Sequence, residues 1–146
     1  MTTWQIDPSH STLGFSVKHL MISTVRGRFA DFSGSVALDE ANPANSSVEV
    51  TIKAGSIDTR SEQRDNHLRS ADFFDAANFP ELTFKSRRVE GDLIRDFTVI
   101  GDLTIRGVTR EVALRASYEG AGRDPWGNER KGYNLSTKIN REDFGL

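Results

Sequence analysis

The sequence contains no cysteine among its 146 residues, which excludes disulfide bonds, zinc–thiolate sites and cysteine nucleophiles in one step. It also lacks any run that approaches the roughly 18 apolar residues that a membrane-spanning helix needs. The segment that begins at Met1 has neither the basic region nor the apolar stretch of a secretory signal. These absences predict a cytoplasmic protein that does not span a membrane.

A strong charge of one sign is missing too. Charged residues make up 27% of the chain, both signs are interspersed, and the net charge is only -2. This composition predicts no nucleic-acid partner, because nucleic-acid binders carry a clustered basic surface. The length fits one domain, and the chain shows no repeat, low-complexity stretch or linker. We therefore treat residues 1–146 as a single domain.

Alternation of apolar and polar residues with a period of two dominates the chain. It is clearest over residues 12–19, 48–54, 96–106, 112–118 and 133–139, with Ile100 as the one exception in the third span. Such alternation is typical of antiparallel strands that have one dry face and one wet face. Several strands at short spacing predict an all-β protein, either a sandwich or a barrel.

One segment, about 60–75, breaks this alternation. Thr59 and Glu62 have the T-x-x-E spacing of a capping box, in which each side chain bonds a backbone N–H of the first helical turn. Residues 60–70 are rich in helix formers, and a further turn is expected near 71–75. The sequence thus predicts one short helical insertion in a meander of strands.

Residues with catalytic or metal-binding chemistry do not form a recognisable motif. His10, His19 and His67 show no i, i+4 spacing on one helix, so structural histidines are favoured over a metal site. His19 shares the parity of the apolar residues that precede it. No G-x-S-x-G elbow is present, and Asp72 is explained most simply as a cap. We predict no catalytic residue, no metal and no cofactor.

Phenylalanine is the most frequent aromatic residue, with nine phenylalanines against two tyrosines and two tryptophans. On the dry face of a barrel these rings could fill the core completely. They could equally line an apolar cavity, because a barrel of about eight strands has room for one small ligand. Sequence alone does not separate the two readings, since both place the same residues inside.

Eight strings in order resemble the YceI-like, polyisoprenoid-binding family, and together they span nearly the whole chain. They are W-x-I-D-P-S-H-S at 4–11, F-S-V-K-H-L at 15–20, V-R-G-R-F at 25–29, R-D-N-H-L-R-S-A-D-F-F-D at 64–75, F-P-E-L-T-F-K-S at 79–86, G-D-L-T-I-R-G-V-T at 101–109, D-P-W-G-N-E-R-K-G-Y at 124–133 and I-N-R-E-D-F-G-L at 139–146.

The resemblance implies a lipocalin-like antiparallel β-barrel that binds, sequesters or transports a long-chain polyisoprenoid, such as an isoprenoid quinone, and that is not an enzyme. It implies that the helical insertion forms a lid, with His67, Arg69 and Asp72 either structural or in contact with a head group. Combined with the alternation, it predicts that the ligand contacts Leu13, Phe15, Val17, His19, Val48, Val50, Ile52, Phe84, Phe97, Val99, Leu103, Ile105, Leu114 and Tyr118, and the lid residues Leu68, Phe73, Phe74 and Trp126.

Three alternatives stay open. The same cavity could hold a fatty acid or a fatty amide, the core could be filled, or the protein could be an enzyme that acts on a lipid head group through His10, His67 or Asp72. The resemblance also implies that family members continue past D-F-G-L with a further strand. We therefore expect either a longer natural chain or a homodimer that forms along an open strand edge.

Overall fold

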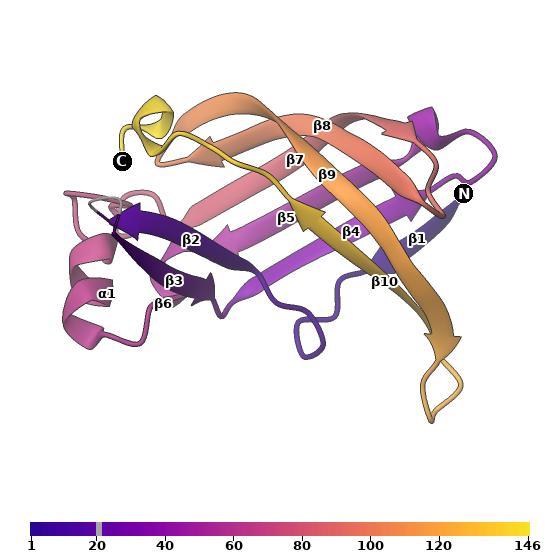
Figure 1. Ribbon diagram of the computed structural model, residues 1–146, viewed down its shortest axis with the longest axis horizontal. Coiled ribbons are helices and arrows are strands. Elements are labelled where there is room, and N and C mark those ends of the chain that lie inside the picture. The colour runs from indigo at the N-terminus through magenta and orange to yellow at the C-terminus, as the bar shows by residue number, and fades with distance from the viewer. Residues whose placement is uncertain (20–21) are drawn as a thin grey trace.

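The computed structural model describes residues 1–19 and 22–146, except for the side chain of His19. One sheet has seven strands in the order β1-β4-β5-β7-β8-β9-β10, and a smaller sheet has the order β2-β3-β6 (Figure 1). The strands are β1 (Thr2–Gln5), β2 (Gly14–His19), β3 (Ser23–Phe29), β4 (Phe32–Leu38), β5 (Ser47–Lys53), β6 (Ile57–Asp58), β7 (Glu81–Gly91), β8 (Asp96–Ile105), β9 (Val108–Arg123) and β10 (Glu129–Ser136). The helices are α1 (Glu62–Arg69) and the 3-10 turns η1 (Pro43–Asn45), η2 (Ala54–Ser56) and η3 (Arg141–Phe144).

All pairs within both sheets are antiparallel, as the alternation predicted. The five predicted spans correspond to β2, β5, β8, β9 and β10, and the all-β fold is confirmed. The large sheet curls into a half-barrel whose two outer strands are β1 and β10 (Figure 1). Among the described residues, no backbone ladder joins these two strands. Pairing of such an edge with a second copy stays a prediction.

Side chains bridge the seam between β1 and β10. Arg130 of β10 donates to the carboxylate of Asp7, just after β1, at 2.6 Å. The next residue, Lys131, passes over the ring of Trp4 in β1 and donates to Glu40, in the segment after β4, at 2.7 Å. Because neighbouring residues of a strand point to opposite faces, Arg130 and Lys131 hold the seam from its two sides. The half-barrel is thus closed here by charged side chains rather than by strand pairing.

A bulge bends the sheet at Gly101. Ser86 pairs with Gly101 and Arg88 pairs with Ile100, so Arg87 is the extra residue of β7. A Cβ atom at position 101 would lie 2.5 Å from the carbonyl oxygen of Lys85, and only glycine fits so close an approach. The bulge strengthens the local bend of the strand, as a curled sheet requires.

The helical insertion is confirmed, but its predicted cap is wrong. The N-cap of α1 is Ser61, whose hydroxyl accepts from the backbone N–H of Arg64, and not Thr59. Thr59 instead donates its N–H and its hydroxyl to the buried carboxylate of Asp65, at 2.9 and 2.5 Å. The left-handed φ of +65° at Arg60 turns the chain between the two. Thr59 therefore ties α1 to β6 and leaves the capping to Ser61.

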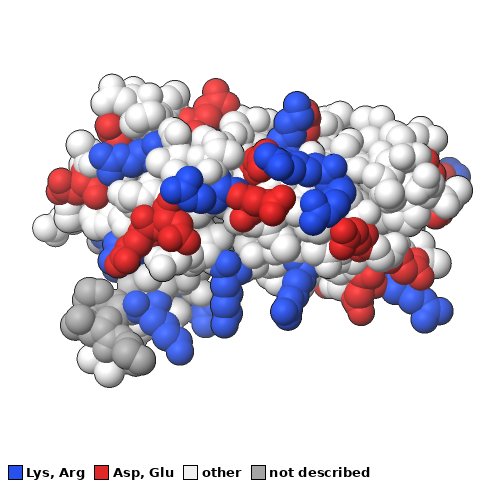
Figure 2. Space-filling view, turned by 90° about the horizontal axis from the view of Figure 1, so that it is seen from above, with Lys and Arg blue, Asp and Glu red and all other residues white. Residues whose placement is uncertain are grey.

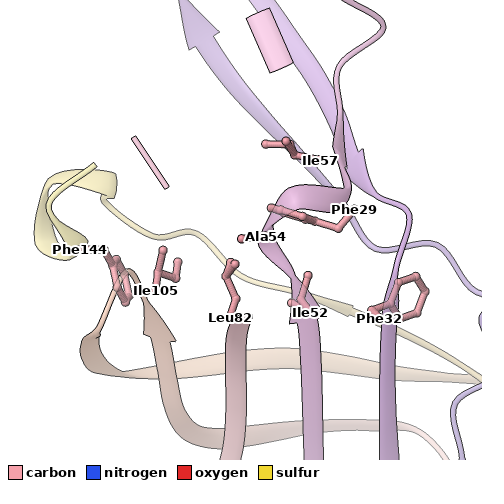
Figure 3. Packing of buried hydrophobic residues seen from close by; sticks show 8 residues of the cluster. All are labelled: Phe29, Phe32, Ile52, Ala54, Ile57, Leu82, Ile105 and Phe144. Carbon is pink, nitrogen blue, oxygen red and sulfur yellow. The ribbon is translucent and has the colours of Figure 1, made fainter. Parts of the chain in front are cut away.

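Two clusters of buried apolar side chains fill the two ends of the half-barrel. The first cluster lies beside α1 and η3 and consists of Phe29, Phe32, Ile52, Ala54, Ile57, Leu82, Ile105 and Phe144, each from a different strand or 3-10 turn (Figure 3). The second cluster consists of Leu38, Val48, Phe84, Val89, Leu93, Phe97, Val99 and Ala116. We call the face of the seven-stranded sheet that carries both clusters the inner face.

The molecular surface carries charges of both signs. Figure 2 shows lysine and arginine side chains beside aspartate and glutamate on one face, with neither sign set apart. Exposed pairs such as Arg87–Asp102 and Arg88–Glu90 have N–O distances of 3.0 and 2.9 Å. Exposed pairs of this kind contribute only about 0–1 kcal/mol each to the free energy of unfolding, so they are not a main source of stability.

Candidate ligand-binding surface

The middle of the inner face is apolar but incompletely covered. Val50 of β5 and Leu103 of β8 both contact the first cluster and the second cluster. Each is nevertheless only partly buried, whereas Ile52, two residues further along β5 on the same face, is buried at 7% exposure. The chain thus covers the two ends of the inner face and leaves an apolar stretch between them accessible.

The predicted ligand contacts divide by their burial. Six of them are buried inside the two clusters and are covered by neighbouring side chains: Val48, Ile52, Phe84, Phe97, Val99 and Ile105. A further six are partly buried and so leave surface for a ligand: Leu13, just before β2, and Phe15, Val50, Leu103, Leu114 and Tyr118 on the strands. On the inner face, buried core residues and the partly buried Val50, Leu103, Leu114 and Tyr118 therefore occur together, at different positions along the strands.

The segment from α1 to residue 79 covers the first cluster. Leu68 and Phe74 pack against that cluster, and the ring of Phe74 meets Phe29 edge to face at 5.8 Å. Phe73 lies differently: its ring packs on His67, with a centroid distance of 5.0 Å, and its carbonyl accepts from Arg106 at 2.9 Å. Phe74 thus packs against the core, whereas Phe73 packs against the exposed side chain of His67.

The polar residues of this segment have structural partners. Arg69 donates to the backbone carbonyls of Gly55 and Ile57, at 2.8 and 3.1 Å, and so fixes α1 to the η2–β6 segment. His67 and Asp72 form an exposed pair at 3.0 Å. The role of Arg69, left open between structural and head-group contact, is therefore structural in this arrangement.

Three predicted contacts lie elsewhere or cannot be placed. Trp126 was predicted to lie with the lid, and this prediction is wrong: Trp126 lies in the β9–β10 turn and is 82% exposed. The carboxylate of Asp124 accepts the backbone N–H groups of Trp126 and Asn128 and so holds this turn away from the inner face. Val17 is 46% exposed, so the packed part of β2 ends before it. The side chain of His19 lies outside the described residues.

The groups considered for catalysis lie at separate exposed sites. His10 contacts Asp7 and Ser9 in the loop after β1, while His67 pairs with Asp72 near α1. The hydroxyl of Ser9, together with His10 and Arg130, holds the pKa of Asp7 well below its ordinary value. Over the described residues, no three histidine, aspartate or glutamate side chains gather as a metal site requires.

A second group of residues on the inner face joins two predicted ligand contacts, Phe97 and Tyr118, to three residues that the sequence analysis missed. We call it the aromatic–lysine cluster: Trp4, Phe97, Tyr118, Lys131 and Tyr133. Tyr133 lies 5.5 Å from Tyr118 and 5.7 Å from Phe97, ring to ring, and the ammonium of Lys131 lies 5.2 Å from the ring centroid of Trp4. Both Trp4 and Tyr133 pack against the second cluster.

The signal for Lys131 was present in the sequence. Lys131 has the same parity as Tyr133, so extending the alternation two residues back would have placed it on the inner face. It was hidden because Glu129, Arg130 and Lys131 together look like a solvated turn. Its side chain is only 20% exposed.

The protonation states of this cluster are well defined. The hydrogen bond to Glu40 raises the pKa of Lys131, so the ammonium stays charged at neutral pH. Burial raises the pKa of Tyr133, so that phenol stays neutral. The indole Nε1 of Trp4 is buried and has no hydrogen-bond partner among the described residues, a situation that costs about 1–3 kcal/mol.

Two open hollows lie away from the centre of the inner face. One, of about 400 Å³, borders the start of α1 and is lined by Ser56–Asp58, Arg60–Glu62, Asp65 and Arg69. The other, of about 560 Å³, is lined by residues of β7, β8, β9 and β10, including Arg115 and Asn134. The lining of the first is mainly charged and polar, whereas the second combines Phe97 and Ala116 of the second cluster with polar side chains. None of the described helices is both long and apolar enough to cross a bilayer.

Comparisons with known proteins agree with this architecture. The YceI-like domain family matches residues 4–146. A UPF0312 protein of Photorhabdus laumondii is 46% identical over 143 residues, which are 97% of this chain and 73% of the relative. Protein YceI of Escherichia coli is 45% identical over 139 residues, 94% of this chain and 71% of the relative.

Solved structures show the same fold. The structure of BcnA from Burkholderia cenocepacia has a TM-score of 0.85 and 26% identity, and covers 95% of this chain and 83% of its own. The YceI protein of Campylobacter jejuni has a TM-score of 0.77 and 38% identity over 99% of this chain and 84% of its own. The half-barrel, the inner face and these relatives agree: the chain belongs to the YceI-like family.

Proposed function

We propose that this protein binds a long apolar lipid of the polyisoprenoid class along its inner face and carries or sequesters it. The observation that carries the proposal is the incomplete burial of Val50 and Leu103 between two apolar clusters. Apolar side chains left accessible on a concave surface are typical of lipid sites, since the ligand supplies the missing cover.

One solved structure that shares the fold is named for this class of ligand. A polyisoprenoid-binding domain from Saccharophagus degradans superposes with a TM-score of 0.54 and 19% identity, over 74% of this chain and 62% of its own. At that identity the likeness speaks for the fold alone. The apolar inner face adds the physical reason: a hydrocarbon chain needs no polar partner along most of its length.

The expected energetics favour a long chain. Each buried CH₂-sized group contributes about 0.8 kcal/mol, so one five-carbon prenyl unit contributes about 4 kcal/mol before the cost of ordering the chain. Affinity should therefore rise with the number of prenyl units until the accessible stretch is covered, and then level off.

The test has two steps. Organic extraction and native mass spectrometry of the purified protein should yield a prenyl lipid; an acyl lipid would support the fatty acid or fatty amide alternative instead. Titration of the delipidated protein with prenols of increasing length should then show the rise and the plateau. Affinity independent of chain length would overturn the proposal and favour a filled barrel.

We propose binding without turnover and without a cofactor. His10 and the His67–Asp72 pair are exposed and share no contact with one another in the described structure. A lipid on the inner face would therefore not bring its head group to a paired acid and base. The absence of any product after prolonged incubation with prenyl esters would support this assignment.

A further inference from the structure

We propose that the β2–β3 hairpin is a docking arm that places the protein on the surface of an anionic lipid bilayer. The proposed function concerns a lipid held on the inner face, whereas this inference concerns the membrane that would supply or receive such a lipid. Binding to vesicles tests the docking arm without any prenyl lipid, so either proposal can fail while the other stands.

The docking arm is the part of the chain where basic residues are not balanced by acidic ones. Residues 8–30 contain Lys18, Arg26 and Arg28 but no aspartate or glutamate, which gives this segment a formal charge of +3. Because the whole chain has a net charge of -2, its other residues together carry -5. Positive charge is therefore concentrated in this one hairpin of a slightly acidic protein.

The three basic side chains lie on one face of the docking arm. Arg26 pairs with Ser16 across the two strands, and Arg28 pairs with Gly14. Residues that pair directly share a face, and so do residues two apart on one strand, so Lys18 lies on the same face as both arginines. All three basic side chains are exposed to solvent. The docking arm thus presents a basic face.

These basic residues have few acidic partners. Among the described residues, neither Lys18 nor Arg26 forms an ion pair, and Arg28 reaches the carboxylate of Asp58 only at 3.5 Å. Several lysine and arginine side chains of β5, β7 and β10 are by contrast paired with carboxylates. The charge of the basic face is therefore available to an anionic partner.

The opposite face of the docking arm is apolar and becomes less covered toward its tip. At the base, Phe15 packs against the first cluster, 5.6 Å from the ring of Phe29. Further out, Val17 pairs with Val25, and in the described structure neither packs against a cluster. Val17 is 46% exposed, and Ile22 in the turn is 87% exposed. Apolar side chains that the protein leaves uncovered in this way are typical of an interaction site.

A bilayer fits this combination better than a soluble acidic partner does. An anionic bilayer presents phosphate groups at its surface and hydrocarbon beneath them. An apolar tip can therefore enter it while lysine and arginine side chains reach the head groups. A soluble polyanion would match the positive charge but would leave Val17 and Ile22 in water.

The docking arm is attached to the end of the half-barrel that the helical insertion covers. Strand β3 pairs with β6, which precedes α1 in the chain, and Phe29 at the end of β3 meets Phe74 at 5.8 Å. The docking arm and α1 lie at the same end of the molecule (Figure 1). Docking would therefore bring this end of the inner face toward the bilayer.

Flotation with vesicles measures docking directly. The lipid-free protein is mixed either with vesicles of phosphatidylcholine or with vesicles that also contain the anionic phosphatidylglycerol. We expect much stronger binding to the anionic vesicles. This binding should weaken as the salt concentration rises, because salt screens the attraction between exposed charges.

Charge variants locate the docking surface. Lys18→Gln together with Arg26→Gln should weaken binding to the anionic vesicles about 25-fold, because each basic residue at such a surface contributes about fivefold. Lys18→Arg together with Arg26→Lys keeps the charge and should bind like the unchanged protein. Arg110→Gln together with Arg115→Gln is the matched control, since it removes the same charge from exposed positions of β9 and should change the affinity far less.

Fluorescent labels at two isoleucines test whether the tip enters the bilayer. Ile22 lies in the β2–β3 turn, and Ile94 is 55% exposed in the β7–β8 turn. Because the chain contains no cysteine, Ile22→Cys and Ile94→Cys each provide one site for a polarity-sensitive fluorophore. On anionic vesicles the emission of the label at position 22 should shift to the blue, and that of the label at position 94 should not. Ile22→Ser should also weaken vesicle binding about tenfold, and Ile94→Ser should not.

The outcomes decide between a bilayer and other partners. Equal binding to both kinds of vesicle, equal losses in the two glutamine variants, or a blue shift at position 94 alone overturns the docking arm. Binding to soluble polyglutamate that is as strong as binding to anionic vesicles, and that is unchanged in Ile22→Ser, assigns the basic face to an acidic polymer and overturns the bilayer. None of these results changes the titration with prenols, and failure of that titration leaves vesicle docking intact.

Discussion

The substitution of leucine by alanine at two positions of the inner face separates a lipid-contacting wall from a filled core. Leu103 contacts both clusters and is partly buried, whereas Leu82 belongs to the first cluster and is 5% exposed. Both residues lie in neighbouring strands, and the same atoms are removed. The two variants therefore differ mainly in what covers the side chain.

The expected losses of stability and of lipid affinity follow from how far other side chains bury each leucine. Leu82→Ala should lower the free energy of unfolding by about 2–5 kcal/mol, because a buried leucine leaves a cavity. Leu103→Ala should cost only about 1–2 kcal/mol, since part of the side chain already meets solvent. If a lipid covers Leu103, the three lost CH₂-sized groups remove up to about 2.4 kcal/mol of binding free energy, or about 50-fold in affinity.

The assay combines urea unfolding of the lipid-free variants with prenol titration. We expect Leu82→Ala to lose more stability and to keep its lipid affinity while folded, and Leu103→Ala to lose less stability but most of its lipid affinity. The same rank order in both measurements would refute the reasoning, because it would mean that Leu103 serves the core and not the ligand. Leu103→Glu extends the test: a charge in the apolar stretch should abolish lipid binding.

Three further predictions concern the helical insertion, the stability at acid pH, and the hydrogen bonds between Thr59 and Asp65. Phe74→Ala should cost about 3 kcal/mol on thermal unfolding, whereas Phe73→Ala should cost less and should speed lipid release, since only Phe74 packs against the first cluster. Because the pKa of Asp7 is depressed on folding, its contribution with Arg130 should be complete above its ordinary pKa of 3.8 and should fade as the pH falls below it; Asp7→Asn should flatten that part of a stability–pH curve. Asp65→Ala should lower the free energy of unfolding by about 1–3 kcal/mol, and an unchanged melting temperature would show that its buried hydrogen bonds contribute nothing.

The strands could be predicted because their signal is local. A period of two over five or more residues identifies a half-buried strand whatever its partner is, and the spans around Val50, Phe97 and Leu114 all proved to be strands. The order of the strands could not be read in the same way. Pairing of β4 with both β1 and β5, or separation of β2, β3 and β6 into a second sheet, depends on contacts between segments far apart in the chain.

Errors in the candidate site arose where a local pattern had two readings. Thr59 and Ser61 both precede helix formers, and only the turn at Arg60 and the buried partner Asp65 decide which of them caps α1. Trp126 looked like a lid residue because it is large and apolar. It is exposed because the hydrogen bonds to the carboxylate of Asp124 fix the turn around it, and no hydropathy pattern records such bonds.

The alternation of apolar and polar residues cannot distinguish a filled interior from an open one. Val50 and Ile52 are two residues apart on one strand, are chemically alike and point to the same face. Ile52 is a buried member of the first cluster, to which β3, η2 and η3 also contribute, whereas Val50 packs against both clusters without belonging to either and is only partly buried. The odd or even position along a strand therefore predicts which residues face inward. Which of these residues stay accessible to a ligand depends on the side chains that distant segments pack over them. Since that cover ends between the two clusters, the lipid should lie across Val50 and Leu103, and substitutions there should change binding before they change folding.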